Sequence, residues 1–227
     1  MQVSASFRAG AALAFGAPAL AMGVTFLAFG AAVAAGGLGL GWALGASLLV
    51  YGMAGQVVLL GGAAGPVLPA VLGATAANAR FLPMAVAIGP LLGPPRVRRW
   101  LALPFIAITP WAAAMRVLPA LPAEVRLGWF LGFALVSWVV AGLATCLGFW
   151  AAPLLGPATL AALVFANPLY FALLMADDLG RPGPRRAVLA GVAAAPLALL
   201  LPPAWGILAA GLLGGTAAFL LGRHERG

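Results

Sequence analysis

The sequence has few charged residues, and this shortage limits the kinds of protein it can encode. Only 7% of its 227 residues are charged, whereas 64% are hydrophobic. Soluble domains carry roughly 25% charged and roughly 45–50% apolar residues, so a soluble fold is excluded. Apolar runs of roughly 20 residues recur instead, which indicates membrane-spanning helices. The roughly ten-residue alternating segments of a transmembrane barrel are absent.

Groups that carry acid–base or metal chemistry are also scarce. The acidic residues all fall in predicted loops or the C-terminal tail: Glu124, Asp177, Asp178 and Glu225. The one histidine, His224, lies in that tail, and the one cysteine, Cys146, has no partner for a disulfide. General acid–base catalysis at depth and a metal site both need such groups inside the membrane part. The sequence therefore predicts no enzyme activity, no cofactor and no metal site.

The positive charge of the chain is confined to short clusters. The formal net charge is +8, and the arginines that produce it stand between apolar runs. The clusters are Arg96, Arg98 and Arg99; Arg181, Arg185 and Arg186; and Arg223 with Arg226. This is the usual excess of positive charge in the cytoplasmic loops of membrane proteins. We therefore expect a lipid bilayer, and no nucleic acid, as the surrounding of this basic chain.

The apolar residues fall into segments separated by glycine and proline, as expected for tight connections. The segments are approximately 11–34, 42–62, 67–92, 100–118, 127–151, 153–176, 187–201 and 204–222. No stretch resembles a soluble domain or a long linker. The sequence predicts an all-α, polytopic integral membrane helical bundle of about seven to eight apolar segments, in one transmembrane domain over residues 1–227.

The arginine clusters also predict which segments cross the membrane incompletely. They place 93–99, 177–186 and the tail on the cytoplasmic side, and Arg8 places the N-terminus there too. Eight full crossings cannot satisfy all of these positions. The conflict disappears if 42–62, interrupted by "YGMAGQ", and 100–118, interrupted by prolines, are broken or re-entrant. Such backbone persists in a membrane where it is buried or lines a cavity. A failure of the charge rule in short loops is the alternative.

Helix breaks and a weak internal repeat complete the expected architecture. We expect breaks at Pro18, Pro110 and Pro168. The stretches "NARFLPM" (78–84) and "NPLYFALLM" (167–175) each begin with asparagine in an apolar run. Transporters often contain inverted repeats with broken segments at matching depths, so the similarity between these two stretches favours such a repeat. Chance similarity between apolar sequences is the alternative.

Arg80 is the most unusual residue inside an apolar segment. It lies roughly 18 Å from the segment's end at 1.5 Å per residue, and a charge at a helix centre costs about 2.5–3.5 kcal/mol on insertion scales. One interpretation is that its guanidinium binds a substrate carboxylate. A second is that Pro83 and Pro90 end the helix early and leave Arg80 at the interface. A third is a structural bond to the carbonyls of a broken helix.

Three amides share this apolar setting and are candidate substrate ligands: Gln56, Asn78 and Asn167. Asn78 and Arg80 are two residues apart, so an intact helix would turn them to different faces, and both serve one site only if the helix is unwound there. Amides in membrane helices also form hydrogen bonds between helices, which is the alternative role for each of them.

Several of these motifs, in this order, resemble the AzlC-type branched-chain amino acid permeases. The similar parts are the first helix with Pro18 and Gly23, the Ala-Gly-Gln motif with Gly55 and Gln56, and the Asn-x-Arg motif with Asn78 and Arg80. The resemblance implies export of branched-chain or related small amino acids across the bacterial cytoplasmic (inner) membrane. It also implies a small multi-spanning partner subunit of the AzlD type.

Two departures from the family pattern bear on mechanism. Phe81 follows the Asn-x-Arg motif where the family usually has histidine. The chain reads "ITPWAAAM" where the family commonly has an Asp-Glu pair, so Thr109 and Trp111 stand in this stretch. With no buried carboxylate, the amide and backbone carbonyl oxygens are left to bind a substrate ammonium. A channel-like or scaffold component without substrate coupling, or a permease for a different small substrate, are the alternatives.

Overall fold

A computed structural model describes residues 3–93, 96–201 and 203–224, and these residues form helices and their connections. Three of the described helices are long and apolar enough to cross a membrane, and two further apolar helices are shorter. The long ones are Ala17–Ala35, Val67–Leu92 and Ala123–Leu154, and the shorter ones are Leu40–Val50 and Ala209–Gly222. The expected helical, multi-pass membrane architecture is therefore present, with fewer full-length helices than the eight apolar segments indicate.

The contacts divide the chain into two compact units, which are described separately. Unit 1 comprises residues 1–56 and 80–167, and unit 2 comprises residues 57–79 and 168–227. The single domain over 1–227 and the inverted repeat both stay predictions.

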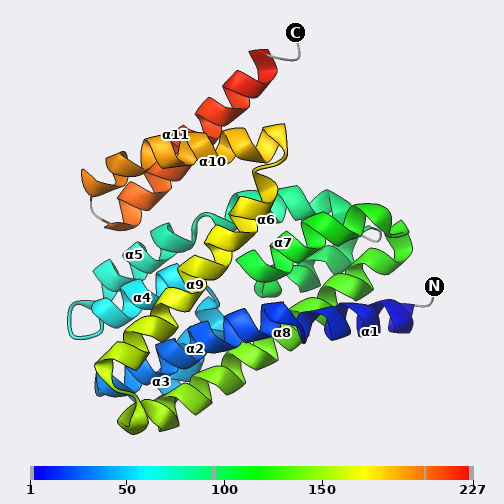
Figure 1. Ribbon diagram of the computed structural model, residues 1–227. Helices are drawn as coiled ribbons and strands as arrows, with labels where there is room; N and C mark the ends of the chain where they lie inside the picture. Colours follow the sequence, from blue (N-terminus) through cyan, green and yellow to red (C-terminus); the bar gives the residue numbers. More distant parts are fainter. Residues whose placement is uncertain (1–2, 94–95, 202, 225–227) are drawn as a thin grey trace. The chain divides into compact units, whose positions relative to one another are not determined.

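Unit 1 contains most of the helices of the first two thirds of the chain (Figure 1). In chain order they are α1 (Val3–Ala14), α2 (Ala17–Ala35), α3 (Leu40–Gly45), η1 (Ala46–Val50), the start of α4 (Met53–Gly61), α6 (Phe81–Ile88), η2 (Gly89–Leu92), η3 (Arg96–Phe105), α7 (Ile108–Val117), η4 (Leu118–Ala120), α8 (Ala123–Ala151), η5 (Ala152–Leu154) and the first half of α9 (Pro157–Asp178). The 29-residue α8 is the longest of them, and α1 and α2 run along it.

Glycines allow α1 and α2 to approach α8 closely. A Cβ atom on Gly30 of α2 would meet the carbonyl oxygen of Thr145, and one on Gly148 of α8 would meet that of Leu27. The same reciprocal arrangement joins α1 to α8: Gly10 faces the carbonyl of Trp129, and Gly132 faces that of Phe7. Small residues at helix crossings in membrane proteins bring backbones together and maximise van der Waals contact. These two crossings therefore fix α1 and α2 against α8.

The first interrupted segment lies between α3 and α4. The helix widens into a π-helical turn at Ala46–Val50 and ends at Tyr51, which has a left-handed backbone conformation (φ 45°, ψ 32°). A new helix begins at Met53. Left-handed conformation is uncommon for a bulky residue and is held by surrounding structure. The interruption that the sequence predicts within 42–62 is therefore present.

The second interrupted segment precedes α7. After η3, the chain passes through Ile106 and Ala107, and Ala107 is fully extended (φ −135°, ψ 169°). Pro110 lies in the first turn of α7, where its missing N–H removes no intrahelical bond. A helix thus begins next to Pro110, and another begins next to Pro18, which lies in the first turn of α2 after the turn at Phe15–Gly16.

The break expected at Pro168 is absent. The 22-residue α9 continues through this proline from Pro157 to Asp178. A proline inside a helix removes one hydrogen bond, and a long helix with regular turns on both sides continues past that loss. The prediction at Pro168 was wrong because it treated the proline as sufficient to end the helix.

Unit 2 consists of the remainder of α4, α5 (Val67–Asn78), the second half of α9, α10 (Pro182–Ala194), η6 (Ala195–Leu199) and α11 (Pro203–His224). α10 and α11 form a close pair, and α11 also contacts α5. Gly214 of α11 makes the pair close, because a Cβ there would lie 3.0 Å from the carbonyl oxygen of Ala190.

Candidate functional site

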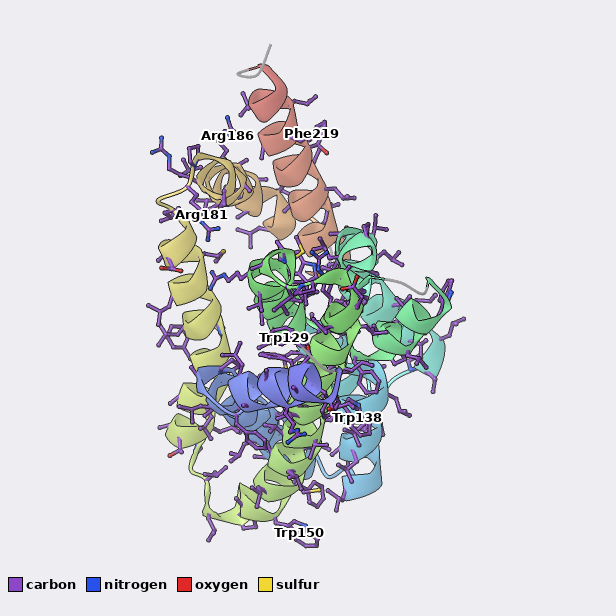
Figure 2. All side chains as sticks on the ribbon, turned by 90° about the vertical axis from the view of Figure 1, so that its right-hand side faces the viewer. Trp129, Trp138, Trp150, Arg181, Arg186 and Phe219 are labelled. Carbon is purple, nitrogen blue, oxygen red and sulfur yellow. The ribbon has the colours of Figure 1, made fainter. Side chains whose placement is uncertain are left out.

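The two interrupted segments of unit 1 meet in one packed cluster. Tyr51 from the first break and Ala107 from the second are both buried, at 3% and 8% exposure, and pack with Trp138 of α8. Figure 2 labels Trp138 between Trp129 and Trp150 along α8. Met22 and Phe26 of α2 complete the cluster. We call these breaks, with Gln56 and the side chains packed on them, the discontinuity site.

Side chains of α8 hold the π-helical turn in place. Trp138 donates its Nε1–H to the carbonyl of Leu48 at 3.0 Å. The hydroxyl of Thr145 donates to the carbonyl of Ala141 at 2.8 Å and lies 2.7 Å from the hydroxyl of Ser47. Because the threonine proton is used toward Ala141, Ser47 is the donor in the second bond. The irregular turn is therefore stabilised from outside by α8.

Gln56 lies directly at the first break and is fully buried. Its Nε2 donates to the carbonyl of Ala46 at 2.9 Å, a carbonyl that also accepts the N–H of Tyr51 at 3.3 Å. The contact with an acceptor identifies this atom as the nitrogen, so the orientation of the amide is determined. Its Oε1 is buried and has no hydrogen-bond partner. The Nε2 of Gln56 thus has a structural role, whereas its Oε1 is available to accept a hydrogen bond from a ligand.

The hydroxyl of Tyr51 is the second free polar group at this break. Its ring stacks on Phe26 with centroids 6.2 Å apart, and its hydroxyl oxygen is buried without a partner. Leaving a buried hydroxyl unsatisfied costs about 1–3 kcal/mol, so two unpartnered polar groups in the segment of one break require an explanation. A bound polar ligand would supply one.

Arg80 stands at the junction of α5 and α6. α5 ends at Asn78 and α6 begins at Phe81, while Ala79 and Arg80 keep helical backbone angles. The backbone there is a tight helical junction, which differs from the unwound segment that a joint site for Asn78 and Arg80 requires. Arg80 is half-buried, its guanidinium carbon lies 5.7 Å from the ring centroid of Phe81, and its Nε is buried without a partner.

The start of α7 adds further polar groups that the sequence interpretation did not single out as ligands. Thr109 is 6% exposed, and the indole Nε1 of Trp111 is buried without a partner. Ser137, next to Trp138 on α8, also has a buried hydroxyl without a partner. α6 packs against α7, where Met84 and Trp111 belong to one core cluster. The stretch in which the resemblance leads one to expect an acidic pair follows directly on the second break.

The remaining predicted site residues lie elsewhere or are partly described. Gly55 is buried in the first turn of α4, beside Gln56 in the sequence. Asn78 ends α5 and belongs to unit 2. Asn167 is within α9, and its side chain lies outside the described part. Of the five predicted ligands, Gln56 and Gly55 are thus at the discontinuity site.

The sequence analysis did not identify three of these polar residues as candidate ligands: Tyr51, Trp111 and Ser137. Tyrosine and tryptophan read as apolar or interfacial in a hydropathy pattern, and serine is ordinary in close helix packing. The signal that was available for Tyr51 is its place in "YGMAGQ", well inside an apolar segment and next to glycine. Nothing in the sequence alone distinguishes Ser137 from a packing serine.

The groups at the discontinuity site are suited to binding a polar ligand. Oε1 of Gln56 accepts hydrogen bonds, and the hydroxyl of Tyr51 both donates and accepts. In the described residues, no group of three or more His, Cys, Asp or Glu side chains is placed to hold a metal ion. Backbone carbonyl oxygens at breaks in membrane helices coordinate cations in transporters, and the oxygens of Gln56 and Tyr51 are neutral acceptors of the same kind.

Comparison with known proteins identifies the family. The family model described as "AzlC protein" matches residues 18–155, which is more than half of the chain and includes both breaks and α8. No curated protein and no solved structure matches the chain significantly. The chain therefore belongs to the AzlC family, a family of branched-chain amino acid transporters.

Proposed function

We propose that this protein is a permease that exports branched-chain or related small apolar amino acids from the bacterial cytoplasm, with a small AzlD-type membrane subunit as its partner. The observation that carries the proposal is the pair of buried, unpartnered oxygens on Tyr51 and Gln56 at a helix break. Family membership supports the substrate class.

The substrate ammonium binds Oε1 of Gln56 and the hydroxyl of Tyr51. Both atoms are neutral acceptors, so they bind a cation without the cost of a buried carboxylate. The Nε2 of Gln56 stays on the carbonyl of Ala46 and keeps the acceptor oriented. This arrangement takes the place of the acidic pair that the resemblance leads one to expect.

The substrate carboxylate binds donors from the helix starts and from Arg80. α4 and α7 each begin at a break, and the first N–H groups of a helix have no intrahelical acceptor and favour an anion. The unpartnered Nε of Arg80 supplies a charged donor. The apolar walls of Met22 and Phe26 suit a branched aliphatic side chain.

A flux measurement tests this function. The chain is reconstituted in vesicles with and without the AzlD-type subunit, and efflux of labelled L-leucine and D-leucine is compared. We expect saturable efflux that favours L-leucine and needs both subunits. Arg80→Gln lowers this efflux at normal expression, whereas Arg8→Gln, at an exposed position of α1, leaves it unchanged. Equal flux of both enantiomers would exclude a selective permease.

A channel-like component is the second candidate, because all four acidic residues lie outside the predicted apolar segments and so offer no buried carboxylate for ion coupling. Such a protein would pass both enantiomers without saturation and without response to a pH gradient. The same vesicles, assayed over a range of leucine concentrations with and without the gradient, distinguish the two.

A further inference from the structure

Two buried polar groups of unit 1 have no role in the fold or in the binding of the substrate ammonium. They are the indole Nε1–H of Trp111 in α7 and the hydroxyl of Ser137 in α8, and neither has a hydrogen-bond partner. Ser137 as a whole is 1% exposed. Because buried polar groups in folded proteins are nearly always hydrogen-bonded, two that are not indicate a ligand.

Ser137 differs from other hydroxyl residues within the described helices. Thr25, Thr75 and Thr145 each donate to the carbonyl four residues earlier in their own helix. This bond is a common way for serine and threonine in a helix to satisfy the hydroxyl. The hydroxyl of Ser137 makes no such bond although it is buried. It is therefore available to a group outside its own helix.

Ser137 and Trp111 lie where the same two core clusters meet. Phe133, four residues before Ser137, belongs to the cluster against which Trp111 packs. Ala141, four residues after Ser137, belongs to the cluster that contains Ala107. Residues four apart lie on one face of a helix, so Ser137 is on the face of α8 that joins both clusters.

The first turn of α7 joins these two clusters as well. The backbone N–H of Trp111 donates to the carbonyl of Ala107 at 3.0 Å, so the two residues are one turn apart. α7 packs against α8. The two unpartnered groups therefore lie at the same level of the second break, one on each of the packed helices.

The hydrogen-bonding character of the two breaks differs. An indole N–H donates and cannot accept, so Trp111 cannot bind an ammonium group. A serine hydroxyl can donate to the same acceptor. At the first break the unpartnered atom of Gln56 is an oxygen, which accepts. The first break thus offers an acceptor to a cation, and the second break offers donors to an anion.

We propose that the Nε1–H of Trp111 and the hydroxyl of Ser137 bind the substrate carboxylate and select amino acids over amines. This inference rests on the proposed function and deepens it. A carboxylate accepts several hydrogen bonds on its two oxygens, so these donors act together with Arg80 and the helix starts. The substrate lies with its ammonium toward the first break and its carboxylate toward the second.

Binding measurements with two ligands test the proposal. L-leucine and isopentylamine, which is leucine without its carboxylate, are titrated by calorimetry into the chain purified with its AzlD-type subunit. Trp111→Phe and Ser137→Ala each remove one donor and keep the packing. We expect each variant to weaken L-leucine binding about ten-fold, because a hydrogen bond to a charged group is lost. The affinity for isopentylamine stays at its wild-type value.

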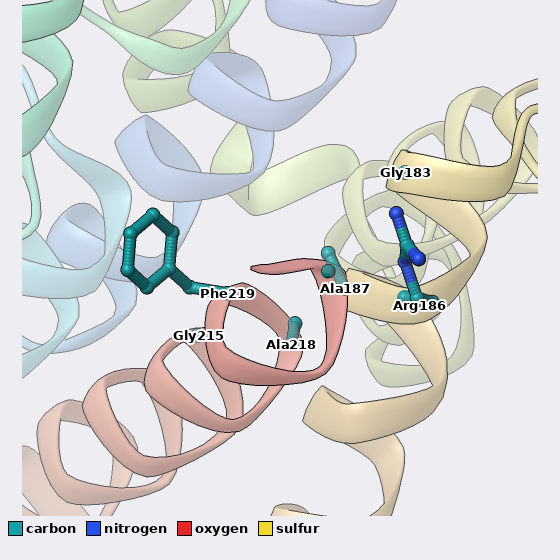
Figure 3. A pocket seen from close by; sticks show the side chains of 7 residues that line it. Gly183, Arg186, Ala187, Gly215, Ala218 and Phe219 are labelled. Atoms are coloured by element: carbon teal, nitrogen blue, oxygen red, sulfur yellow. The ribbon is translucent and has the colours of Figure 1, made fainter. Parts of the chain in front are cut away.

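Two control variants show that the effect belongs to this site. Trp150→Phe removes the indole N–H of a tryptophan of α8 that is 70% exposed. Gly215→Leu fills a pocket of about 440 Å³ between α10 and α11, a second place where a small ligand could bind (Figure 3). Both controls keep the wild-type affinity for L-leucine. A loss of affinity in Gly215→Leu would place the ligand in unit 2 and overturn the proposal.

The remaining outcomes separate this inference from the proposed function. Equal weakening of both ligands, or wild-type affinity for L-leucine in either donor variant, overturns the inference and leaves the permease function standing. Absence of L-leucine binding by the wild-type complex contradicts the function and the inference together. If Trp111→Phe does not fold, Ser137→Ala decides the binding test alone.

Proton NMR of the indole N–H groups gives a second readout, which does not need isopentylamine to bind. The resonance of Trp111 is identified by its absence from the spectrum of Trp111→Phe, and that of Trp150 by its absence from Trp150→Phe. We expect saturating L-leucine to move the Trp111 resonance downfield, because its N–H gains a charged acceptor. The Trp150 resonance stays in place. An unchanged Trp111 resonance at saturating L-leucine overturns the proposal.

Discussion

At the scale of single residues, the polar side chains at the discontinuity site divide into those that support structure and those that are unpartnered. Trp138, Ser47 and the Nε2 of Gln56 make hydrogen bonds that hold the π-helical turn. The hydroxyl of Tyr51 and Oε1 of Gln56 make none. Removing a structural hydrogen bond destabilises the fold, whereas removing an unsatisfied buried hydroxyl costs little or stabilises it. Mutations of the two kinds of side chain can therefore distinguish an effect on stability from an effect on transport.

Tyr51→Phe is the variant that uses this difference. It keeps the ring against Phe26 and removes only the hydroxyl. We expect the thermal midpoint to stay the same or rise and the KM for L-leucine efflux to rise about ten-fold, because a hydrogen bond to a charged group contributes about 1.5–3 kcal/mol. Parallel thermal unfolding and flux measurements check this. An unchanged KM would remove Tyr51 from the site.

At the scale of elements, α8 is the support on which unit 1 is assembled. Its glycines meet the backbone of α1 and α2, and its Trp138 and Thr145 hold the π-helical turn next to α3. A side chain added at a crossing glycine therefore separates the helices and also disturbs the turn that carries Tyr51.

Gly30→Ala tests this support. The added methyl group meets the carbonyl oxygen of Thr145, so we expect a loss of about 1–3 kcal/mol in stability, the usual range for overpacking. Gly23→Ala is the matched control in the same helix, because its Cβ would lie 3.9 Å from a methyl group of Val140, an ordinary contact. Thermal unfolding in the same detergent compares the two. Equal midpoints for both variants would contradict the close crossing.

The elements also show what the sequence can and cannot predict. The breaks in 42–62 and 100–118 were predictable because glycine and proline interrupt the apolar pattern and eight full crossings conflict with the positive-inside rule. The continuity of α9 through Pro168 was not, because one missing hydrogen bond does not reveal how the rest of a helix compensates. The reciprocal contacts of Gly10 and Gly132 join residues far apart in the chain, and no local pattern reports them.

The candidate site was predictable only in part, for a related reason. Gln56 stood out because an amide is rare in an apolar segment, and the structure puts it at the break, buried. Tyr51 did not stand out because its apolar ring hides its hydroxyl in a hydropathy pattern. In Gln56, Nε2 is hydrogen-bonded and Oε1 is not, and this difference depends on the position of the Ala46 carbonyl, which the sequence does not give.

At the scale of the whole molecule, the discontinuity site lies in unit 1. The family match, over residues 18–155, includes both breaks of this site. We therefore propose that the two broken segments of unit 1 bind the transported substrate.

The measurement that tests this central claim most directly is hydrogen–deuterium exchange over the whole chain, with the partner subunit bound, in the presence of L-leucine or D-leucine. Amides at the starts of α4 and α7 have no intrahelical acceptor and exchange readily when no ligand covers them. We expect L-leucine to slow exchange in peptides covering 46–56 and 106–111, and D-leucine to do so much less. Protection confined to other segments, with those two unchanged, would contradict it.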